Sequence, residues 1–314
     1  MADLILHHFE GSPFSEKVRL ILGYKQLAWK SVIVPSISPK PDVVSLTGGY
    51  RKTPFLQIGA DIYCDTALIC EVLEQLHPAP TLYPQAVAGL ARVVAQWADN
   101  TLFWSAVTFN RGPKGTGSKF GGASPEVAKA LFDDRKAMGF DLEWVRPADA
   151  ATPYQSYLQR LVDMLQHQPY LLGQQPCIAD FCAYHPLWLA HVRPPGVMDL
   201  VRPMPTLTAW LDRMQTIGHG RMVQIDSAQA LSAAAQAQPA LLAEGPLRTT
   251  DFHDEHGIAL GSSVAIMAES FGREPTAGEL VAATRTHYSL RRTDDRAGTV
   301  HVHFPRIGYV LRQL

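Results

Sequence analysis

The chain has 314 residues, of which 46% are hydrophobic and 18% are charged, so it is long enough to bury more than one hydrophobic core. Its 28 Lys and Arg residues balance its 29 Asp and Glu residues without a long run of either sign, which argues against nucleic acid or an anionic membrane as a partner. No apolar stretch approaches the ~20 residues that span a bilayer, and residues 1–11 lack the pattern of a secretion signal. We therefore expect a cytoplasmic protein.

The first elements predicted along the chain are a strand, a tight turn and a helix. The apolar run of residues 4–6 is followed by a polar stretch, and then by Ser12 and Pro13. Pro13 suits the first position of a helix, and Ser12 before it is a natural N-cap. The Ser12 hydroxyl is therefore expected at the positive end of a helix, beside free backbone N–H groups, where an anion is favoured.

A second group of elements follows at residues 51–69. The sequence predicts a strand that contains Phe55, a turn at Gly59, a second strand, and a helix that Asp65 or Thr66 caps. A carboxylate or a hydroxyl thus begins the last of these helices.

The N-terminal part of the chain resembles the thioredoxin-like domain of the cytosolic glutathione transferases. That family has a catalytic Ser, Tyr or Cys near the first helix, a cis-proline after a hydrophobic residue, and an acidic residue followed by Ser at the third helix. Ser12, Pro54 and the pair Asp65 and Thr66 occupy these positions here, although Thr53 and Thr66 depart from the commoner Val and Ser.

Beyond the proline-rich residues 77–80 the pattern becomes helical. Apolar residues recur at helical spacing, and we expect helices near residues 86–110, 152–167, 178–192, 205–217 and 227–237. Residues 176–181 resemble the capping box of the family's helical domain, with Asp180 in place and Cys177 instead of a hydroxyl residue, which weakens the cap by up to about 1 kcal/mol. Residues 205–214 also resemble a late helix of the family.

The last segment, residues 241–314, lies outside this resemblance. Alternating apolar residues near 264–268, 280–290 and 300–304, with a turn at 294–298, predict a small antiparallel β unit. The expected fold is thus a multidomain α+β protein. It has a thioredoxin-like glutathione-binding α/β domain, an all-α helical-bundle domain and a small C-terminal antiparallel β unit, over residues 1–80, 84–240 and 241–314 respectively.

Two histidines, His301 and His303, share one face of the last predicted strand. A metal site would need further ligands, such as His287, His253 or an acidic residue, that the sequence does not bring together. We therefore expect a solvated strand face and no metal.

The resemblance implies that glutathione is the cosubstrate and that its thiolate must be stabilised. A free thiol with a pKa of about 8.5 is mostly protonated at pH 7. A hydroxyl donor to a charged acceptor contributes about 1.5–3 kcal/mol and a helix N-terminus about 0.3–1 kcal/mol, so Ser12 is expected to lower that pKa by about one to two units. A cysteine at this position would instead favour thiol exchange.

The charges of glutathione suggest its remaining partners. Asp65 would bind the γ-glutamyl ammonium group and Thr66 the carboxylate beside it, while Thr53, before Pro54, would pair with the cysteinyl backbone. The glycyl carboxylate needs a cation, and the resemblance also places an aromatic residue in this site. The carboxylate is expected to bind Lys40, Arg51 or Lys52. The expected aromatic residue is Phe14.

Each of these assignments has an alternative. Ser12 and Asp65 could act only as helix caps, and Ser15 could activate the thiol instead. An aromatic group near residues 97–109 could line a pocket for a second substrate, but we expect most of it to pack in the core. This group consists of Trp97, Phe103, Trp104 and Phe109.

The leading hypothesis is a glutathione-dependent transferase in which Ser12 activates the thiolate for attack on a small electrophile. The alternatives are a catalytically silent binding or assembly protein, and a glutathione-dependent isomerase, dehalogenase or ether-cleaving enzyme. The family suggests a homodimer formed through the edge of the first domain. Residues 112–151, which include a glycine-rich stretch at 112–119, are expected to be a lid or a surface insertion. The four cysteines, which form no C-x-x-C pair, are expected to be buried thiols: Cys64, Cys70, Cys177 and Cys182.

Overall fold

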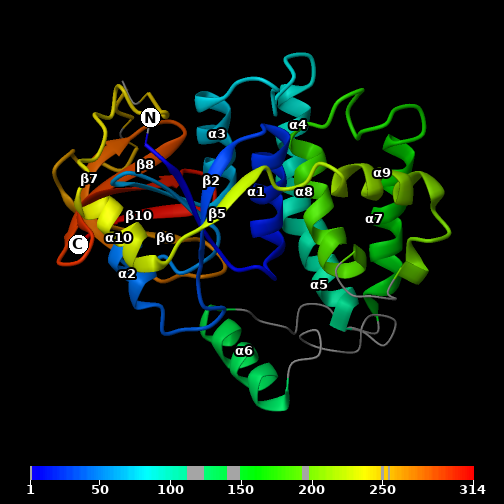
Figure 1. The fold of residues 1–314 in the computed structure, drawn as a ribbon, viewed down its shortest axis with the longest axis horizontal. Coiled ribbons are helices and arrows are strands. Elements are labelled where there is room, and N and C mark those ends of the chain that lie inside the picture. The colour runs from blue at the N-terminus through cyan, green and yellow to red at the C-terminus, as the bar shows by residue number, and fades with distance from the viewer. Residues whose placement is uncertain (1, 112–123, 140–148, 193–197, 249–250, 254) are drawn as a thin grey trace.

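The fold is known from a computed structural model that describes residues 2–111, 124–139, 149–192, 198–248, 251–253 and 255–314. Two lobes make up the molecule (Figure 1). One lobe is built around a β-sheet that contains both ends of the chain, and the other consists of helices. Within the described residues, no helix is long and apolar enough to cross a membrane.

The first domain has the thioredoxin-like arrangement that the sequence predicts. Strand β1 pairs in parallel with β2 and antiparallel with β3, and β3 pairs antiparallel with β4. The elements are β1 (Leu4–His8), α1 (Pro13–Tyr24), β2 (Ala28–Ile33), α2 (Pro41–Thr47), β3 (Phe55–Ile58), β4 (Asp61–Cys64) and α3 (Thr66–Leu76).

The sheet of this domain is buried on both faces. Successive side chains of a strand point to opposite faces. Accordingly, Leu4 and Leu6 of β1 belong to one hydrophobic core, which continues into the helical lobe, and Ile5 belongs to a second core, which continues into the C-terminal strands. The first domain is thus held between the other two parts of the chain.

The helical lobe confirms the predicted helices. A single π-helical turn, Ala98–Leu102, joins the two helices that fill the predicted range 86–110. Helix α6 was not predicted, and the glycine-rich stretch 112–119 lies outside the described residues. The helices are α4 (Ala88–Trp97), α5 (Phe103–Arg111), α6 (Pro125–Ala137), α7 (Ala151–Met164), α8 (Ile178–Leu187) and α9 (Pro205–Gln215), with a second π-helical turn at Trp188–Val192 and a 3₁₀ turn at Met198–Leu200.

A buried carboxylate organises the start of α8. Asp180 is fully buried and accepts hydrogen bonds from the backbone N–H of Cys177 (3.0 Å), the backbone N–H of Leu171 (2.8 Å) and the indole N–H of Trp210 (2.9 Å). The predicted capping residue is therefore confirmed, and its two additional donors tie α8 to the preceding turn and to α9.

After the helical lobe, the chain returns to the sheet. Strand β5 (Arg221–Gln224), which was not predicted, pairs in parallel with β2, and the predicted helix α10 (Ser227–Ala235) follows. One outer strand of the first domain, β2, thus pairs with a later part of the chain. The other outer strand, β4, also pairs with a later strand.

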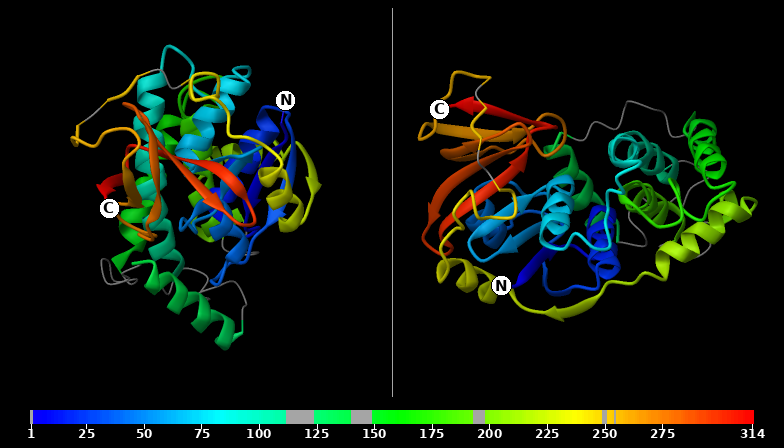
Figure 2. Two further views of the ribbon diagram at one scale, coloured as in Figure 1. Left: turned by 90° about the vertical axis from the view of Figure 1, so that its left-hand side faces the viewer. Right: turned by 90° about the horizontal axis from the view of Figure 1, so that it is seen from above.

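The C-terminal strands form the predicted antiparallel unit, but this unit continues the sheet of the first domain. Strand β9 pairs in parallel with β4, which gives one ten-stranded sheet of order β10-β6-β7-β8-β9-β4-β3-β1-β2-β5. In Figure 2 the C-terminal strands, coloured orange to red, lie beside the blue elements of the first domain. The strands are β6 (Ser263–Ala268), β7 (Thr276–Ala283), β8 (His287–Asp294), β9 (Gly298–Pro305) and β10 (Tyr309–Gln313). A homodimer formed through the edge of the first domain stays a prediction, and neither β2 nor β4 is an open edge.

This junction overturns the expectation of a solvated histidine face on the last hairpin. Strand β9 lies inside the sheet, between β8 and β4. His303 is therefore 3% exposed, and its ring stacks on Tyr63 of β4 at 4.6 Å between ring centroids. The side chains of β9 alternate between two faces as predicted, but the face that carries the histidines is covered as well.

Candidate active site

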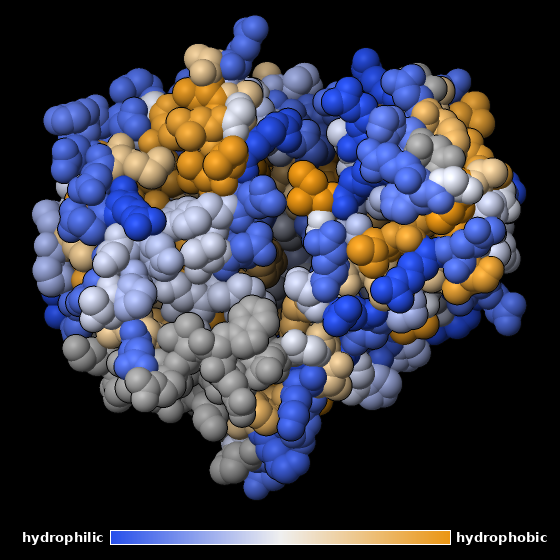
Figure 3. All heavy atoms as spheres, turned by 180° about the vertical axis from the view of Figure 1, so that it is seen from behind, coloured by the Kyte–Doolittle hydropathy of each residue, from blue (hydrophilic) through white to orange (hydrophobic). Residues whose placement is uncertain are grey.

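A cavity of about 2000 Å³ opens where the first domain, the helical lobe and the C-terminal strands meet. The space-filling view from behind shows a hollow between the two lobes (Figure 3). All nine residues that the sequence assigns to catalysis or glutathione binding line this cavity: Ser12, Phe14, Lys40, Arg51, Lys52, Thr53, Pro54, Asp65 and Thr66.

Ser12 caps helix α1, as the sequence predicts. Its hydroxyl oxygen accepts a hydrogen bond from the backbone N–H of Ser15 (3.3 Å) and donates a long one to the carbonyl oxygen of Thr53 (3.5 Å). The alternative candidate, Ser15, is fully buried and does not line the cavity, and its hydroxyl has no hydrogen-bond partner among the residues that the structure describes. The geometry therefore favours Ser12 over Ser15 as a group that meets a ligand.

The loop opposite Ser12 has the predicted cis-proline. The peptide bond between Thr53 and Pro54 is cis, and β3 begins at the next residue. Thr53 lines the cavity, and its carbonyl oxygen accepts the hydrogen bond from the Ser12 hydroxyl.

Asp65 caps helix α3 with an unusual backbone. Its φ is +75°, a region that few residues other than glycine adopt and that is often found at functional sites. One carboxylate oxygen accepts the backbone N–H of Ala67 (2.9 Å), and the other accepts the hydroxyl of Tyr309 (3.0 Å). A carboxylate has about four acceptor positions, so two remain for a ligand.

Two lysines bring positive charge to the same cavity. Lys40 is 7% exposed and donates to the carbonyl oxygen of Arg51 (3.2 Å), and burial lowers its pKa to about 8, with a smaller contribution from Arg135. Lys52 lies over the rings of Tyr50 and Tyr309, with its Nζ 5.4 and 5.0 Å from their centroids, and burial lowers its pKa as well. An anionic ligand group would compensate both desolvated charges.

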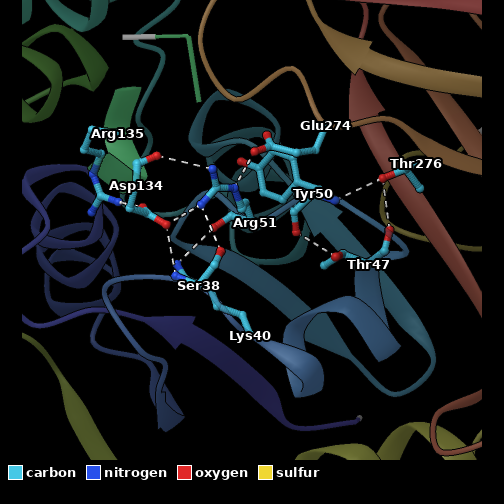
Figure 4. Close-up of polar contacts among 9 residues, drawn as sticks. All are labelled: Ser38, Lys40, Thr47, Tyr50, Arg51, Asp134, Arg135, Glu274 and Thr276. Atoms are coloured by element: carbon cyan, nitrogen blue, oxygen red, sulfur yellow. Dashed lines mark hydrogen bonds and ion pairs between the residues drawn. The ribbon is translucent and has the colours of Figure 1, made fainter. Parts of the chain in front are cut away.

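Arg51, also proposed for the glycyl carboxylate, is occupied by two carboxylates of the protein. Its Nη1 donates to Asp134 Oδ1 of α6 (2.6 Å) and to the Ser38 hydroxyl (2.9 Å), and its Nε donates to Glu274, just before β7 (Figure 4). The guanidinium group therefore links the first domain to the helical lobe and to the C-terminal strands. This makes Arg51 a structural residue, and leaves Lys40 and Lys52 as the candidates for the ligand.

The C-terminal strands are also bonded to the loop before the cis-proline. The backbone N–H of Tyr50 donates to the Thr276 hydroxyl (3.2 Å), which donates to the carbonyl oxygen of Thr47 (3.1 Å) (Figure 4). A Cβ added at Gly49 would lie 2.2 Å from the carbonyl oxygen of Pro275, so this approach requires glycine. The strands thus hold the wall of the cavity that carries Lys52 and Thr53.

Sequence reasoning missed two tyrosines of the site. The hydroxyl of Tyr50 accepts the backbone N–H of Asp65 (3.1 Å), while Tyr309 donates to the carboxylate of the same residue. Tyr309 lies in β10, at the other end of the chain, and no pattern in the sequence connects it with Asp65.

A buried ion pair forms part of the cavity wall between α1 and the helical lobe. The Nζ of Lys17, whose side chain is fully buried, donates to Asp99 Oδ2 (2.7 Å), and His185 Nε2 lies 2.8 Å from Asp99 Oδ1. Burial opposes ionisation of Asp99, but the charge of Lys17 and the bond from His185 outweigh it and lower the pKa of Asp99 to about 2. Burial lowers the pKa of His185 to about 4, so His185 is neutral at pH 7. No sequence pattern indicates this network.

The aromatic group divides between the cavity and the core. Trp97, Phe103 and Trp104 line the cavity, whereas Phe109 is 3% exposed and packs against Tyr154. The expectation that most of this group is core is therefore wrong, because the π-helical turn Ala98–Leu102 and the start of α5 face the first domain across the cavity.

The predicted state of the cysteines is confirmed. All four are free and buried. Burial raises the pKa of Cys64, next to Asp65, well above its usual value, so its thiol is not a nucleophile at pH 7.

Comparison with known proteins agrees with this arrangement. The family model of the glutathione S-transferase N-terminal domain matches residues 6–81, and that of the C-terminal domain matches residues 143–213. The crystal structure of a GST-like protein from Pseudomonas syringae is 39% identical, covers 100% of both chains and superposes with a TM-score of 0.80.

Two curated relatives match parts of the chain. Pyrimidodiazepine synthase of Drosophila melanogaster is 30% identical over 86 residues, which are 26% of this chain and 35% of that protein. FtsZ-localized protein A of Caulobacter vibrioides is 26% identical over 183 residues, which are 57% of this chain and 73% of that protein. Together with the full-length structural match, these findings show that the chain belongs to the glutathione S-transferase superfamily, to whose fold it adds C-terminal β-strands.

Proposed function

We propose that the protein is a glutathione-dependent transferase in which Ser12 stabilises the glutathione thiolate for attack on a small electrophile. The observation that carries this proposal is the convergence of a helix-capping hydroxyl, a cis-proline loop and a capping carboxylate on one cavity, at Ser12, Thr53 and Asp65.

The chemistry of Ser12 follows from its place at the start of α1. Its only described acceptor is the Thr53 carbonyl oxygen at 3.5 Å, a distance at which a hydrogen bond is weak, so the hydroxyl can turn to a thiolate at little cost. The amides of the first turn of α1 add a positive potential at the same point. The sulfur is then held as an anion without a general base.

The peptide portion of glutathione would be bound by the remaining groups. Asp65 would accept the γ-glutamyl ammonium group, and Thr66, the first residue of α3, would bind the adjacent carboxylate with its backbone N–H and hydroxyl. Thr53 would pair with the cysteinyl backbone, and the ammonium groups of Lys40 and Lys52 would bind the glycyl carboxylate. Because the Tyr309 hydroxyl fixes the Asp65 carboxylate, the C-terminal strands would take part in ligand recognition.

The size of the cavity leaves room for a second substrate. Its volume of about 2000 Å³ exceeds the roughly 300–1000 Å³ of a site for one small ligand. Phe14 and Phe103 pack against each other at 4.8 Å between ring centroids, and Trp104 packs against Phe271 in the loop between β6 and β7. This apolar wall would hold an apolar electrophile next to the thiolate. The four free cysteines fit a reducing compartment such as the cytoplasm.

Calorimetric titration with reduced glutathione at pH 7 tests the site. We expect saturable binding with one site per chain, and affinity about ten- to hundredfold lower in Asp65→Asn, because a charge-assisted hydrogen bond is worth about 1.5–3 kcal/mol. Asparagine keeps the helix cap and tolerates a positive φ, so the change removes mainly the charge. Asp226→Asn, at the capping residue of α10, is the matched control and should bind like the unaltered protein.

A second candidate function is a binding or assembly protein without catalysis. The resemblance to FtsZ-localized protein A, together with the additional strands, motivates it. Absence of glutathione binding by the unaltered protein would favour this candidate and reject the transferase. Equal affinity in Asp65→Asn would reject the assigned role of Asp65.

A further inference from the structure

Three potential metal ligands converge where the C-terminal strands join the first domain. In the parallel pair of β4 and β9, Asp61 lies opposite His301, and Tyr63 lies opposite His303. One ligand atom from each of Asp61, His301 and His303 lies within 4.8 Å of the other two. Asp61 Oδ1 is 3.0 Å from His303 Nε2 and 3.7 Å from His301 Nδ1.

One of these atoms lacks a hydrogen bond in a place where it should have one. The Nδ1 of His301 is buried and has no hydrogen-bond partner in the described part of the chain, because 3.7 Å to Asp61 is too long for a hydrogen bond. A buried polar atom without a protein partner is uncommon, and a bound ion is one way to satisfy it.

The separations suit a small divalent cation. Zinc lies about 2.0–2.2 Å from imidazole nitrogen and carboxylate oxygen, so ligand atoms of a tetrahedral site are about 3.3 Å apart. The two separations from Asp61 Oδ1, 3.0 and 3.7 Å, lie on either side of this value. Small side-chain movements would therefore complete the coordination.

Neighbouring groups already orient two of the three ligands. The second oxygen of Asp61 accepts the backbone N–H of Ala240 (2.8 Å), which leaves Oδ1 for the imidazoles. His303 Nδ1 lies 2.7 Å from the Ser289 hydroxyl, so this nitrogen can keep its proton and Nε2 can offer its lone pair. Such supporting hydrogen bonds are typical of metal-binding histidines and carboxylates.

Space for a further ligand lies beside two of the three residues. A small cavity of about 10 Å³ lies next to Asp61 and His303, under the segment 240–247. This is close to the minimum volume that holds one water molecule. Three protein ligands and one water would give the usual coordination number of zinc.

We propose that Asp61, His301 and His303 form a binding site for a divalent transition metal, with Zn²⁺ as the best fit, that fastens β9 of the C-terminal strands to β4 of the first domain. The ligand set of two imidazoles and one carboxylate matches the preference of Zn²⁺ and disfavours Mg²⁺ or Ca²⁺, which take oxygen ligands. The site is separate from the proposed glutathione cavity, since none of its three residues lines that cavity.

Metal content and affinity test the site in the full-length protein. Chelator-treated protein is dialysed against Zn²⁺, its bound metal is counted, and its affinity is measured by competition with a chromogenic chelator. We expect about one tightly bound Zn²⁺ per chain. His301→Gln should weaken binding more than tenfold, at least as much as the loss of an outer-shell partner. Because His301 Nδ1 has no hydrogen bond to lose, this variant should fold normally, as circular dichroism would show.

A control separates this site from surface binding. His253 is exposed, pairs with Glu255 and lies outside the cluster, so His253→Gln should bind Zn²⁺ like the unaltered protein. Bound Co²⁺ should show the visible absorption of a tetrahedral site and lose it in His301→Gln. The proposal is overturned if the unaltered protein binds no stoichiometric Zn²⁺, or if His301→Gln binds it equally well.

Discussion

Replacement of Asp99 by asparagine is expected to lower the free energy of unfolding by about 3–5 kcal/mol, which is the usual cost of leaving a buried charge without its partner. The side chain of Lys17 is 0% exposed and that of Asp99 is 18% exposed, so water can reach Asp99 only in part and cannot replace it as a partner of Lys17. Asparagine keeps the shape of the side chain and removes its charge. Chemical denaturation at pH 7 measures the effect.

An exposed ion pair provides the control for this variant. Lys129 and Asp133 of α6 are 77% and 55% exposed, so Asp133→Asn should change the free energy of unfolding by no more than about 0.5 kcal/mol. A similar small change in Asp99→Asn would contradict the view that the Lys17 and Asp99 pair holds the helical lobe against α1.

The same pair makes a prediction for acid stability. The pKa of Asp99 in the folded protein, about 2, lies below its usual value of 3.8. Its contribution is therefore complete above pH 4 or so, and is lost as the pH falls toward about 2. The unaltered protein should lose stability over this interval, and Asp99→Asn should show a flatter dependence there.

Replacement of Ser12 by alanine is expected to reduce turnover with glutathione and an aryl halide about 10- to 100-fold, because a hydroxyl bond to a charged acceptor is worth about 1.5–3 kcal/mol. Glutathione affinity should change much less, since the peptide contacts at Asp65 and the lysines remain. The helix cap is also lost, so stability should fall by about 1 kcal/mol. Steady-state kinetics with the folded variant separate these effects.

The chain contains a matched control for the lost cap. Ser124 caps α6 in the same Ser-Pro arrangement and accepts the backbone N–H of Val127, but it does not line the cavity. Ser124→Ala should therefore leave turnover unchanged. An unchanged rate in Ser12→Ala would remove Ser12 from the mechanism.

Local signals were enough to predict the first domain, together with the helix caps and the cis-proline of the candidate site. The cap at Ser12, the cis bond before Pro54 and the cap at Asp65 depend on residues that are near one another in the sequence. The general rules of helix capping and the family resemblance therefore predicted the caps and the cis bond. The structure brings these groups to one cavity.

The junction of the C-terminal strands could not be predicted, because it depends on pairing between distant residues. Nothing in the alternation of β9 indicates that its partner is β4, and a strand with one apolar face looks the same at an edge as inside a sheet. The burial of His303 and the contact between Tyr309 and Asp65 both follow from this pairing, so both were missed.

Helix α6 was missed for a related reason. It follows a glycine-rich stretch, and six of its thirteen residues are charged. Its position depends on Arg51, which binds Asp134. Arg51 was only one of three candidates for the glycyl carboxylate, because an exposed cation and a cation held by two carboxylates cannot be distinguished from sequence alone.

The proposed function requires that the protein hold the sulfur of glutathione as a thiolate. The ultraviolet absorbance of the thiolate of bound glutathione, followed as a function of pH, tests this for the unaltered protein and for Ser12→Ala. We expect a thiol pKa at least about one unit below the usual value near 8.5, and a return toward that value in Ser12→Ala. A bound thiol that titrates like the free one in the unaltered protein would contradict it.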